Sequence, residues 1–144
     1  MYLPRYKVAL IKEGNCKVLS RYISSPADAF AILRSDFGLS DREIFSILLL
    51  DTRNNVIGLH QVSIGSLNAS IVHPRETFKA AILCNAAAII LAHCHPSGDL
   101  DPSKEDLIVT ARLKQAGDLL GVPVLDHLIV NDISFISLKE RGLL

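Results

Sequence analysis

Hydrophobic and polar residues alternate near the start of the chain in a pattern that favours β structure. Residues 6–11 and 16–23 are two β-favouring runs, and Glu-Gly-Asn at 13–15 is typical of a hairpin turn. A Ser-Pro pair at 25–26 then matches a helix N-cap followed by proline. The pattern predicts a β-hairpin and then a helix over residues 26–36.

The middle of the chain predicts a second pair of strands, a helix and a buried strand. Residues 43–50 form a dense apolar run, and after a turn cluster residues 56–64 alternate as an antiparallel partner would. Apolar residues at helical spacing predict a helix over residues 74–85. The short apolar run at 87–92 fits a strand covered on both faces, which belongs in the interior of a sheet.

The last third predicts the longest helix, over residues 103–120, and a closing strand over residues 124–130. The pattern assigns no element to residues 133–144. Because neither a repeat nor a linker interrupts the pattern, we expect residues 1–144 to form one α/β domain, a mixed β-sheet flanked by helices.

Composition and charge narrow the class of protein. Fifteen Lys and Arg balance fifteen Asp and Glu, which argues against a non-specific nucleic-acid binder without excluding a local basic patch. Three cysteines, an odd number, favour the reducing cytoplasm, and we expect Cys16 and Cys84 to be small core residues. The apolar run at 86–92 is too short to cross a membrane. We therefore expect a soluble cytoplasmic protein.

Two histidines follow the buried apolar run. His93 and His95 project to the same side of an extended strand, while Cys94 points away. Asp106 falls in the first turn of the longest helix, where it can face the end of that strand. Two imidazoles and one carboxylate leave a fourth position for water, as in catalytic zinc sites. We predict one Zn²⁺ per chain, bound by His93, His95 and Asp106.

Simpler roles for the same residues stay open. Ser103 and Asp106 have the spacing of a helix capping box, and histidines beside proline often belong to a loop, in which case no metal binds. His127 is a candidate further ligand or partner of a ligand. More often such a residue is a partly buried histidine held by a local acceptor, and we expect this of His127.

The spacing His93-Cys94-His95, seven residues, Ser103, two residues, Asp106 matches the zinc motif of the JAMM metallopeptidases, the metal-binding MPN domains. Over roughly residues 20–144 the chain resembles the JAB domain of the bacterial RadC-like proteins. The segments that carry this resemblance are Pro-Arg-Glu at 74–76, Ala-His-x-His-Pro-Ser-Gly-Asp at 92–99, Pro-Ser-x-x-Asp at 102–106 and Asp-His at 126–127. The resemblance implies the cytidine-deaminase-like fold of the JAB/MPN domains and a zinc-dependent peptidase or isopeptidase that acts on peptide or protein substrates.

Two departures from the family pattern limit what carries over. Cys94 stands where this branch usually has asparagine, but an outward residue does not change the ligands. Longer members have a helix-hairpin-helix region ahead of the JAB domain, and we expect nothing before residue 20 to contain one. The chain therefore resembles the short, stand-alone form, to which DNA-related roles carry over poorly.

Hydrolysis also needs a general base beside the activated water. Glu43 and Glu76 are candidates, and we prefer Glu43 because the family's catalytic glutamate precedes a strand, whereas Glu76 would favourably meet a helix dipole. Ser103 would hydrogen-bond the oxyanion, a role whose loss costs ~10²–10³ in rate. The alternative function is a non-catalytic zinc-binding scaffold or a DNA-repair-associated module. A nucleobase deaminase fits poorly because its His-x-Glu and Pro-Cys-x-x-Cys motifs are absent.

Overall fold

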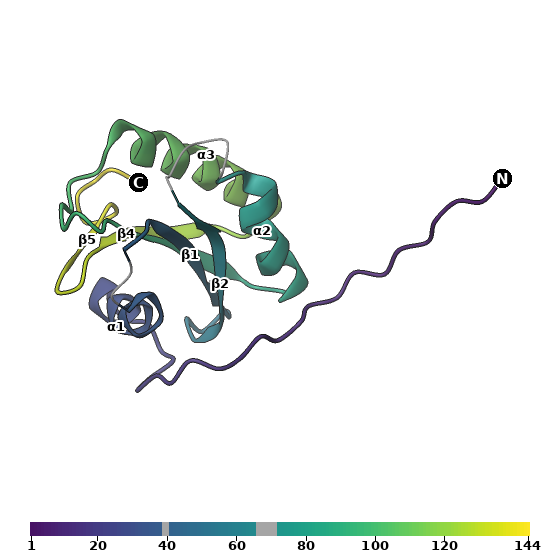
Figure 1. The fold of residues 1–144 in the computed structure, drawn as a ribbon, viewed down its shortest axis with the longest axis horizontal. Coiled ribbons are helices and arrows are strands. Elements are labelled where there is room, and N and C mark those ends of the chain that lie inside the picture. The colour runs from purple at the N-terminus through teal and green to yellow at the C-terminus, as the bar shows by residue number, and fades with distance from the viewer. Residues whose placement is uncertain (39–40, 66–71) are drawn as a thin grey trace.

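The computed structural model describes residues 1–38, 41–65 and 72–144, and it places a sheet between two layers of helices (Figure 1). The elements, in chain order, are α1 (Pro26–Phe37), β1 (Ile44–Leu50), β2 (Val56–Ile64), α2 (Pro74–Leu83), β3 (Ala88–Cys94), α3 (Lys104–Leu120), β4 (Val124–Val130) and β5 (Phe135–Ser137). In the part of the chain just defined, none of the helices is long and apolar enough to cross a membrane.

The five strands form one mixed sheet in the order β2-β1-β3-β4-β5. β3 and β4 are parallel, and the other neighbouring pairs are antiparallel. Every residue of β1 and β3 is buried, as expected for central strands with helices on both faces. The predicted α/β fold with a mixed sheet is therefore confirmed.

Alternation along the central strands divides the core into two parts. On one face of the sheet α1 packs against alternate residues of β3 that end with Ala92 and Cys94. On the other face α2 and α3 pack against Ile89 and Leu91 (Figure 1). Because side chains alternate with period 2, His93 belongs to the face that α3 covers. The sheet thus directs His93 toward α3 and Cys94 toward α1.

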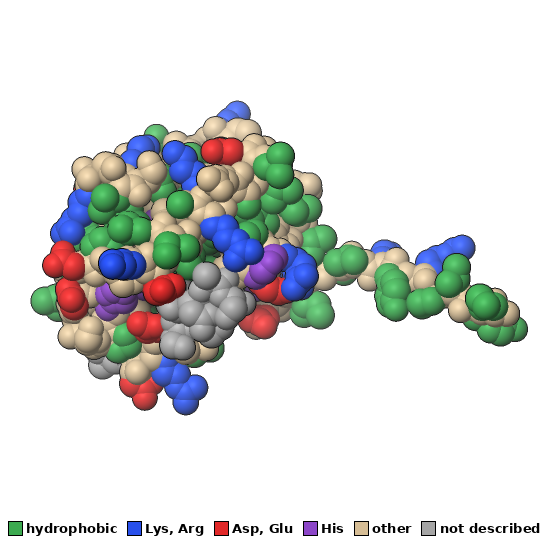
Figure 2. All heavy atoms as spheres, turned by 90° about the horizontal axis from the view of Figure 1, so that it is seen from above, with side chains coloured by type: hydrophobic (Ala, Val, Ile, Leu, Met, Phe, Trp, Pro, Cys, Tyr) green, Lys and Arg blue, Asp and Glu red, His purple; other side chains and the backbone are tan. Residues whose placement is uncertain are grey.

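The hairpin predicted for residues 6–23 is wrong. Residues 1–21 form neither strand nor helix, and Figure 2 shows the beginning of the chain leaving the body with hydrophobic side chains exposed along it. The segment meets the sheet at residues 21–23, where Tyr22 forms an isolated bridge to Asn55 and the carbonyl of Arg21 accepts from the N–H of Val56 at 2.7 Å. A two-stranded hairpin gains too little burial to be stable without a third strand or a packed face. A β-favouring sequence pattern without such burial therefore does not produce a stable hairpin.

Smaller differences concern cysteines and element ends. Cys16 is exposed, so the expectation that it is a core residue is wrong, whereas Cys84 is half-buried and packs against the core. α2 ends at Leu83, before Asn85 adopts a positive φ of 52°. β3 extends to Cys94, so His93 lies within the strand and His95 just after it. Residues 133–144, to which the sequence pattern assigned no element, contain the short edge strand β5.

Gly117 fixes how closely α3 packs against its neighbours. A Cβ at this position would lie 2.6 Å from the carbonyl oxygen of Val122 and 3.2 Å from a ring carbon of Phe78. Alanine improves helix propensity by about 1 kcal/mol, but overpacking against backbone costs about 1–3 kcal/mol. We therefore predict that Gly117→Ala lowers the free energy of unfolding in urea, whereas Gly14→Ala, with open space around its Cβ, changes it little. Equal stability of Gly117→Ala and wild type would contradict this packing.

Candidate metal centre

The end of β3 and the beginning of α3 supply the three predicted ligands. His93 is completely buried, and the side chain of His95 is 13 % exposed. The backbone N–H of His95 donates to the carbonyl of Val130 at 3.0 Å, which holds the chain to the sheet for one residue beyond β3. The two imidazoles therefore start from a rigid strand end.

A capping box orients Asp106 at the start of α3. The Ser103 hydroxyl accepts from the N–H of Asp106 at 3.1 Å, and the Asp106 carboxylate accepts from the N–H of Ser103 at 2.7 Å. The carboxylate is nonetheless buried, and it faces His93 with Oδ1 and His95 with Oδ2, the oxygen that also accepts from Ser103. The capping role that the sequence left open is present, and it holds Asp106 toward the candidate site.

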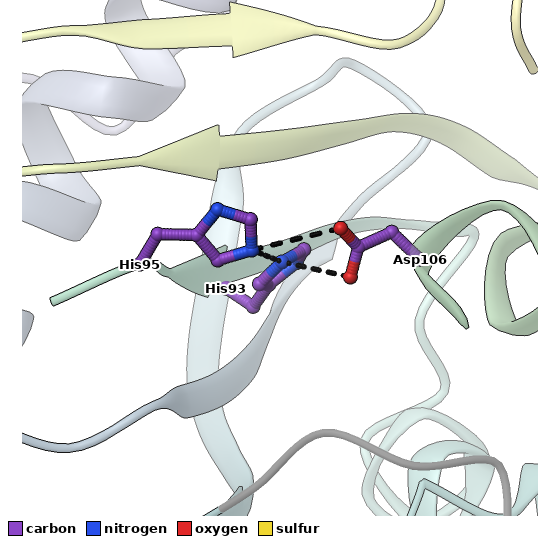
Figure 3. A group of neighbouring side chains, drawn as sticks. All are labelled: His93, His95 and Asp106. Atoms are coloured by element: carbon purple, nitrogen blue, oxygen red, sulfur yellow. Dashed lines mark hydrogen bonds and ion pairs between the residues drawn. The ribbon is translucent and has the colours of Figure 1, made fainter. Parts of the chain in front are cut away.

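The three side chains converge on one point (Figure 3). Nε2 of His93 lies 3.1 Å from Oδ1 of Asp106, and Nε2 of His95 lies 3.6 Å from Oδ2. The two Nε2 atoms are 2.8 Å apart, and one ligand atom from each residue falls within 4.8 Å of the others. Imidazole nitrogen and carboxylate oxygen are the usual ligands of zinc. The three residues can therefore hold a metal ion, as predicted.

The contact between Nδ1 of His95 and a backbone carbonyl favours metal binding through the other ring nitrogen. Nδ1 of His95 lies 2.6 Å from the carbonyl oxygen of Asp99, which can only accept a hydrogen bond. In the neutral imidazole the proton is therefore on Nδ1, and the lone pair of Nε2 faces His93 and Asp106. This backbone contact is the type that usually fixes the tautomer of a metal-binding histidine.

The charges of these groups match a cation site. Burial opposes ionisation of Asp106, but its close contacts with the imidazoles of His93 and His95 outweigh it and hold the pKa of Asp106 well below its usual range. The hydrogen bond to Asp106 raises the pKa of His95, although desolvation opposes this. Asp106 is therefore an anion at neutral pH. A buried anion beside two imidazoles favours a positive charge among them.

His127 is more closely connected to the site than the sequence indicated. It is completely buried rather than partly buried, and its Nε2 lies 2.9 Å from Nδ1 of His93. Its Nδ1 lies 2.6 Å from the hydroxyl of Thr110. Burial lowers the pKa of His127 well below its ordinary value, so it stays neutral. The expected local acceptor is Thr110, and the structure also makes His127 a partner of a ligand.

Thr110 is the site residue that our sequence reasoning missed. It lies four residues after Asp106, on the same face of α3, and its hydroxyl donates to the Asp106 carbonyl at 2.6 Å. The helical spacing from Asp106 was the available signal. It could be recognised only after the sheet had placed His127 opposite that face.

An open cleft of about 260 Å³ adjoins the three ligands. Its lining residues are Glu43, His95, Ser97, Asp99, Asp101, Ser103, Glu105 and Asp106. Glu43 comes directly before β1, in which Phe45 pairs with His93, so it lies toward the end of β3 that carries His95. The charge of Glu43 contributes to the raised pKa of His95. The structure thus brings both predicted catalytic residues, Glu43 and Ser103, to the same cleft as the ligands.

Glu76, the other candidate base, faces elsewhere. It lies in the first turn of α2, where its carboxylate contacts Lys79 at 3.0 Å and Arg75 at 3.6 Å. The hydrogen bond from Lys79 lowers the pKa of Glu76. Its side chain is not among those lining the cleft. Among the two candidates, the geometry favours Glu43.

Comparison with known proteins identifies relatives over most of the chain. A family model described as the RadC-like JAB domain matches residues 23–143. UPF0758 proteins of Moorella thermoacetica, Shouchella clausii and Methanosarcina mazei are 55 %, 53 % and 48 % identical over 122, 126 and 122 residues. These alignments cover 85 %, 88 % and 85 % of this chain, but 53 %, 55 % and 53 % of the relatives, so the chain spans about half their length.

The region matched by the family model includes the strand end and the helix start that carry the three candidate ligands. It also includes Glu43 and the buried contacts behind the site. The chain belongs to the family of RadC-like JAB domains.

Proposed function

We propose that this chain is a zinc-dependent hydrolase of peptide or isopeptide bonds. The observation that carries the proposal is the convergence of His93, His95 and Asp106 beside an open cleft that Glu43 and Ser103 also line. Two imidazoles and one carboxylate make up the protein ligands of many catalytic zinc sites. The openness of the cleft leaves room for water and a substrate carbonyl on the exposed side of the three ligands.

His93, His95 and Asp106 would hold the zinc ion at the inner end of the cleft. When bound, zinc supplies a Lewis acid that polarises a carbonyl and lowers the pKa of water to about 7. The buried ligands and the capping box keep the three donor atoms in place. Less reorganisation is then needed when the substrate binds.

Glu43 would move the proton. Its carboxylate takes a proton from the attacking water and returns it to the leaving amine, so that the same group acts first as a base and then as an acid. Its place on the cleft wall next to His95 supports this role. The ion pairs of Glu76 on α2 point to a surface role for that residue instead.

Ser103 would stabilise the oxyanion without giving up its capping role. In the capping box its hydroxyl oxygen accepts a hydrogen bond from the N–H of Asp106, so its own proton is not used there. The hydroxyl can therefore donate to an oxyanion in the cleft while the cap stays intact. The capping role and the oxyanion role that the sequence suggested for Ser103 are therefore compatible.

The charge of the cleft bears on the substrate. Asp99, Asp101, Glu105 and Glu43 add carboxylates to its wall, and the guanidinium of Arg141 forms an ion pair with Asp101 at 3.1 Å. Such a surface attracts peptides with lysine or arginine near the scissile bond and repels a phosphate backbone. It favours peptide hydrolysis over the alternative of a DNA-repair-associated module. A zinc-binding scaffold without activity is the remaining alternative.

Zinc binding is the first prediction. The chain purified without an affinity tag should bind one equivalent of zinc in a calorimetric titration. His95→Ala should weaken binding by about 100-fold or more, because a catalytic zinc site has only three protein ligands. His60→Ala, on β2 and outside the group of ligands, is the matched control and should bind as wild type does. If added zinc does not bind to the wild type, the site is only a capped helix beside two histidines.

Loss of the general base should separate binding from activity. We predict that Glu43→Gln retains zinc but lowers hydrolysis by ~10²–10⁴, the usual contribution of acid–base catalysis. Glu76→Gln should behave as wild type. The assay is turnover of a library of basic and acidic peptides and lysine-linked isopeptides, with basic members preferred. Zinc binding without cleavage by the wild type would favour the scaffold.

Ser103→Gly should distinguish the oxyanion role from the cap. Glycine is a tolerable N-cap, so the free energy of unfolding should fall by only a few tenths of a kcal/mol, about what such a replacement usually costs. The turnover number should fall by ~10²–10³ because the hydroxyl donor is gone. Urea unfolding and kinetics on the same preparation give both values. Unchanged turnover would assign Ser103 to capping alone.

A further inference from the structure

A continuous line of buried polar groups runs behind the candidate ligands. It joins His93, His127 and Thr110 and ends at the backbone carbonyl of Asp106. All three side chains are at most 1 % exposed, and the ring of Phe45 stacks on His93 and meets His127 edge-on. The rings are confined in this way, and the Thr110 hydroxyl oxygen lies between Nδ1 of His127 and the Asp106 carbonyl.

The last group in the line fixes the direction of its hydrogen bonds. The Thr110 hydroxyl lies 2.6 Å from the Asp106 carbonyl oxygen, which can only accept, so the single hydroxyl proton points there. The same oxygen lies 2.6 Å from Nδ1 of His127. Having used its proton, Thr110 can only accept from His127. Nδ1 of His127 therefore carries a proton.

The direction then passes from His127 to His93. A neutral imidazole with its proton on Nδ1 has a lone pair on Nε2, and Nε2 of His127 lies 2.9 Å from Nδ1 of His93. Nδ1 of His93 must be the donor in this contact. Its own Nε2 then presents a lone pair toward Asp106 and His95, the direction in which a metal ion would be bound.

We propose that Thr110 and His127 are positioning residues that hold His93 in its metal-binding tautomer. Without the acceptor at Thr110, His127 could carry its proton on Nε2 and donate it to His93. His93 would then carry its own proton on Nε2, 3.1 Å from Asp106 Oδ1, and would bond to the carboxylate instead of a metal ion. The hydroxyl of Thr110 selects between these two arrangements. The inference rests on the metal-binding part of the proposed function and not on hydrolysis.

The chain offers a matched control for this role. Thr77 in α2 is also completely buried, and its hydroxyl also donates to the carbonyl four residues earlier, that of His73, at 3.1 Å. Thr77 is not part of the line behind the ligands. Thr77→Val therefore repeats the loss of a buried hydroxyl from a helix without touching His127.

The test compares zinc affinity by competition with a chromophoric chelator. Thr110→Val, which keeps the shape of the side chain, should bind zinc about 10–100-fold more weakly, as when the outer partner of a ligand is lost. Thr110→Ser should restore tight binding, and Thr77→Val should bind as wild type does. Urea unfolding of each variant checks that it is folded.

Nitrogen NMR of the histidine rings gives a second readout, which reports the tautomers directly. In zinc-loaded wild type, His127 should be protonated on Nδ1 alone and His93 on Nδ1, and Thr110→Val should change the tautomer of His127. Protonation of His127 on Nε2 in the wild type, or equal zinc affinity of Thr110→Val and wild type, would overturn the positioning role of Thr110 and His127. Either result would leave the proposed function intact. Failure of the wild type to bind zinc would overturn both.

Discussion

The parallel pairing of β3 with β4 imposes the constraint on which the site depends. Two parallel neighbours need a crossover connection, and here α3 supplies it. A helix that returns the chain in this way begins beside the end of the first strand. The end of β3 and the first turn of α3 are therefore brought together by topology, before any side chain is considered. The histidines and the aspartate occupy the two sides of that junction.

Burying the junction has an energetic cost that the local contacts offset. A carboxylate as buried as that of Asp106 loses its hydration, and leaving it unpaired would be strongly destabilising. It gains a backbone hydrogen bond from Ser103 and contacts with two imidazoles. The capping box therefore serves the fold and the candidate site together. It stabilises the start of α3 and also sets the direction of the carboxylate.

The parts of the site that follow from local rules could be predicted from the sequence. Period 2 in a strand placed His93 and His95 on one side, and the capping spacing placed Asp106 at a helix start. Properties that depend on packing could not be read in this way. Residues 6–23 have a hairpin pattern, but within this segment the core includes Ile23 and the partly buried Val18 and not two paired strands. The contact between Thr110 and His127 joins α3 to β4, which only the folded sheet brings together.

The buried line of hydrogen bonds ends at Asp106, which is also one of the three candidate ligands. Asp106 supplies a carboxylate oxygen next to Nε2 of His93, while its backbone carbonyl accepts the last hydrogen bond of the line that starts at Nδ1 of the same histidine. His93 and Asp106 are therefore connected on both sides of the imidazole. Because a carbonyl cannot donate, the whole line has one direction, and that direction leaves Nε2 as the acceptor. The backbone of α3 thus determines which nitrogen of a residue in β3 is available to a metal ion.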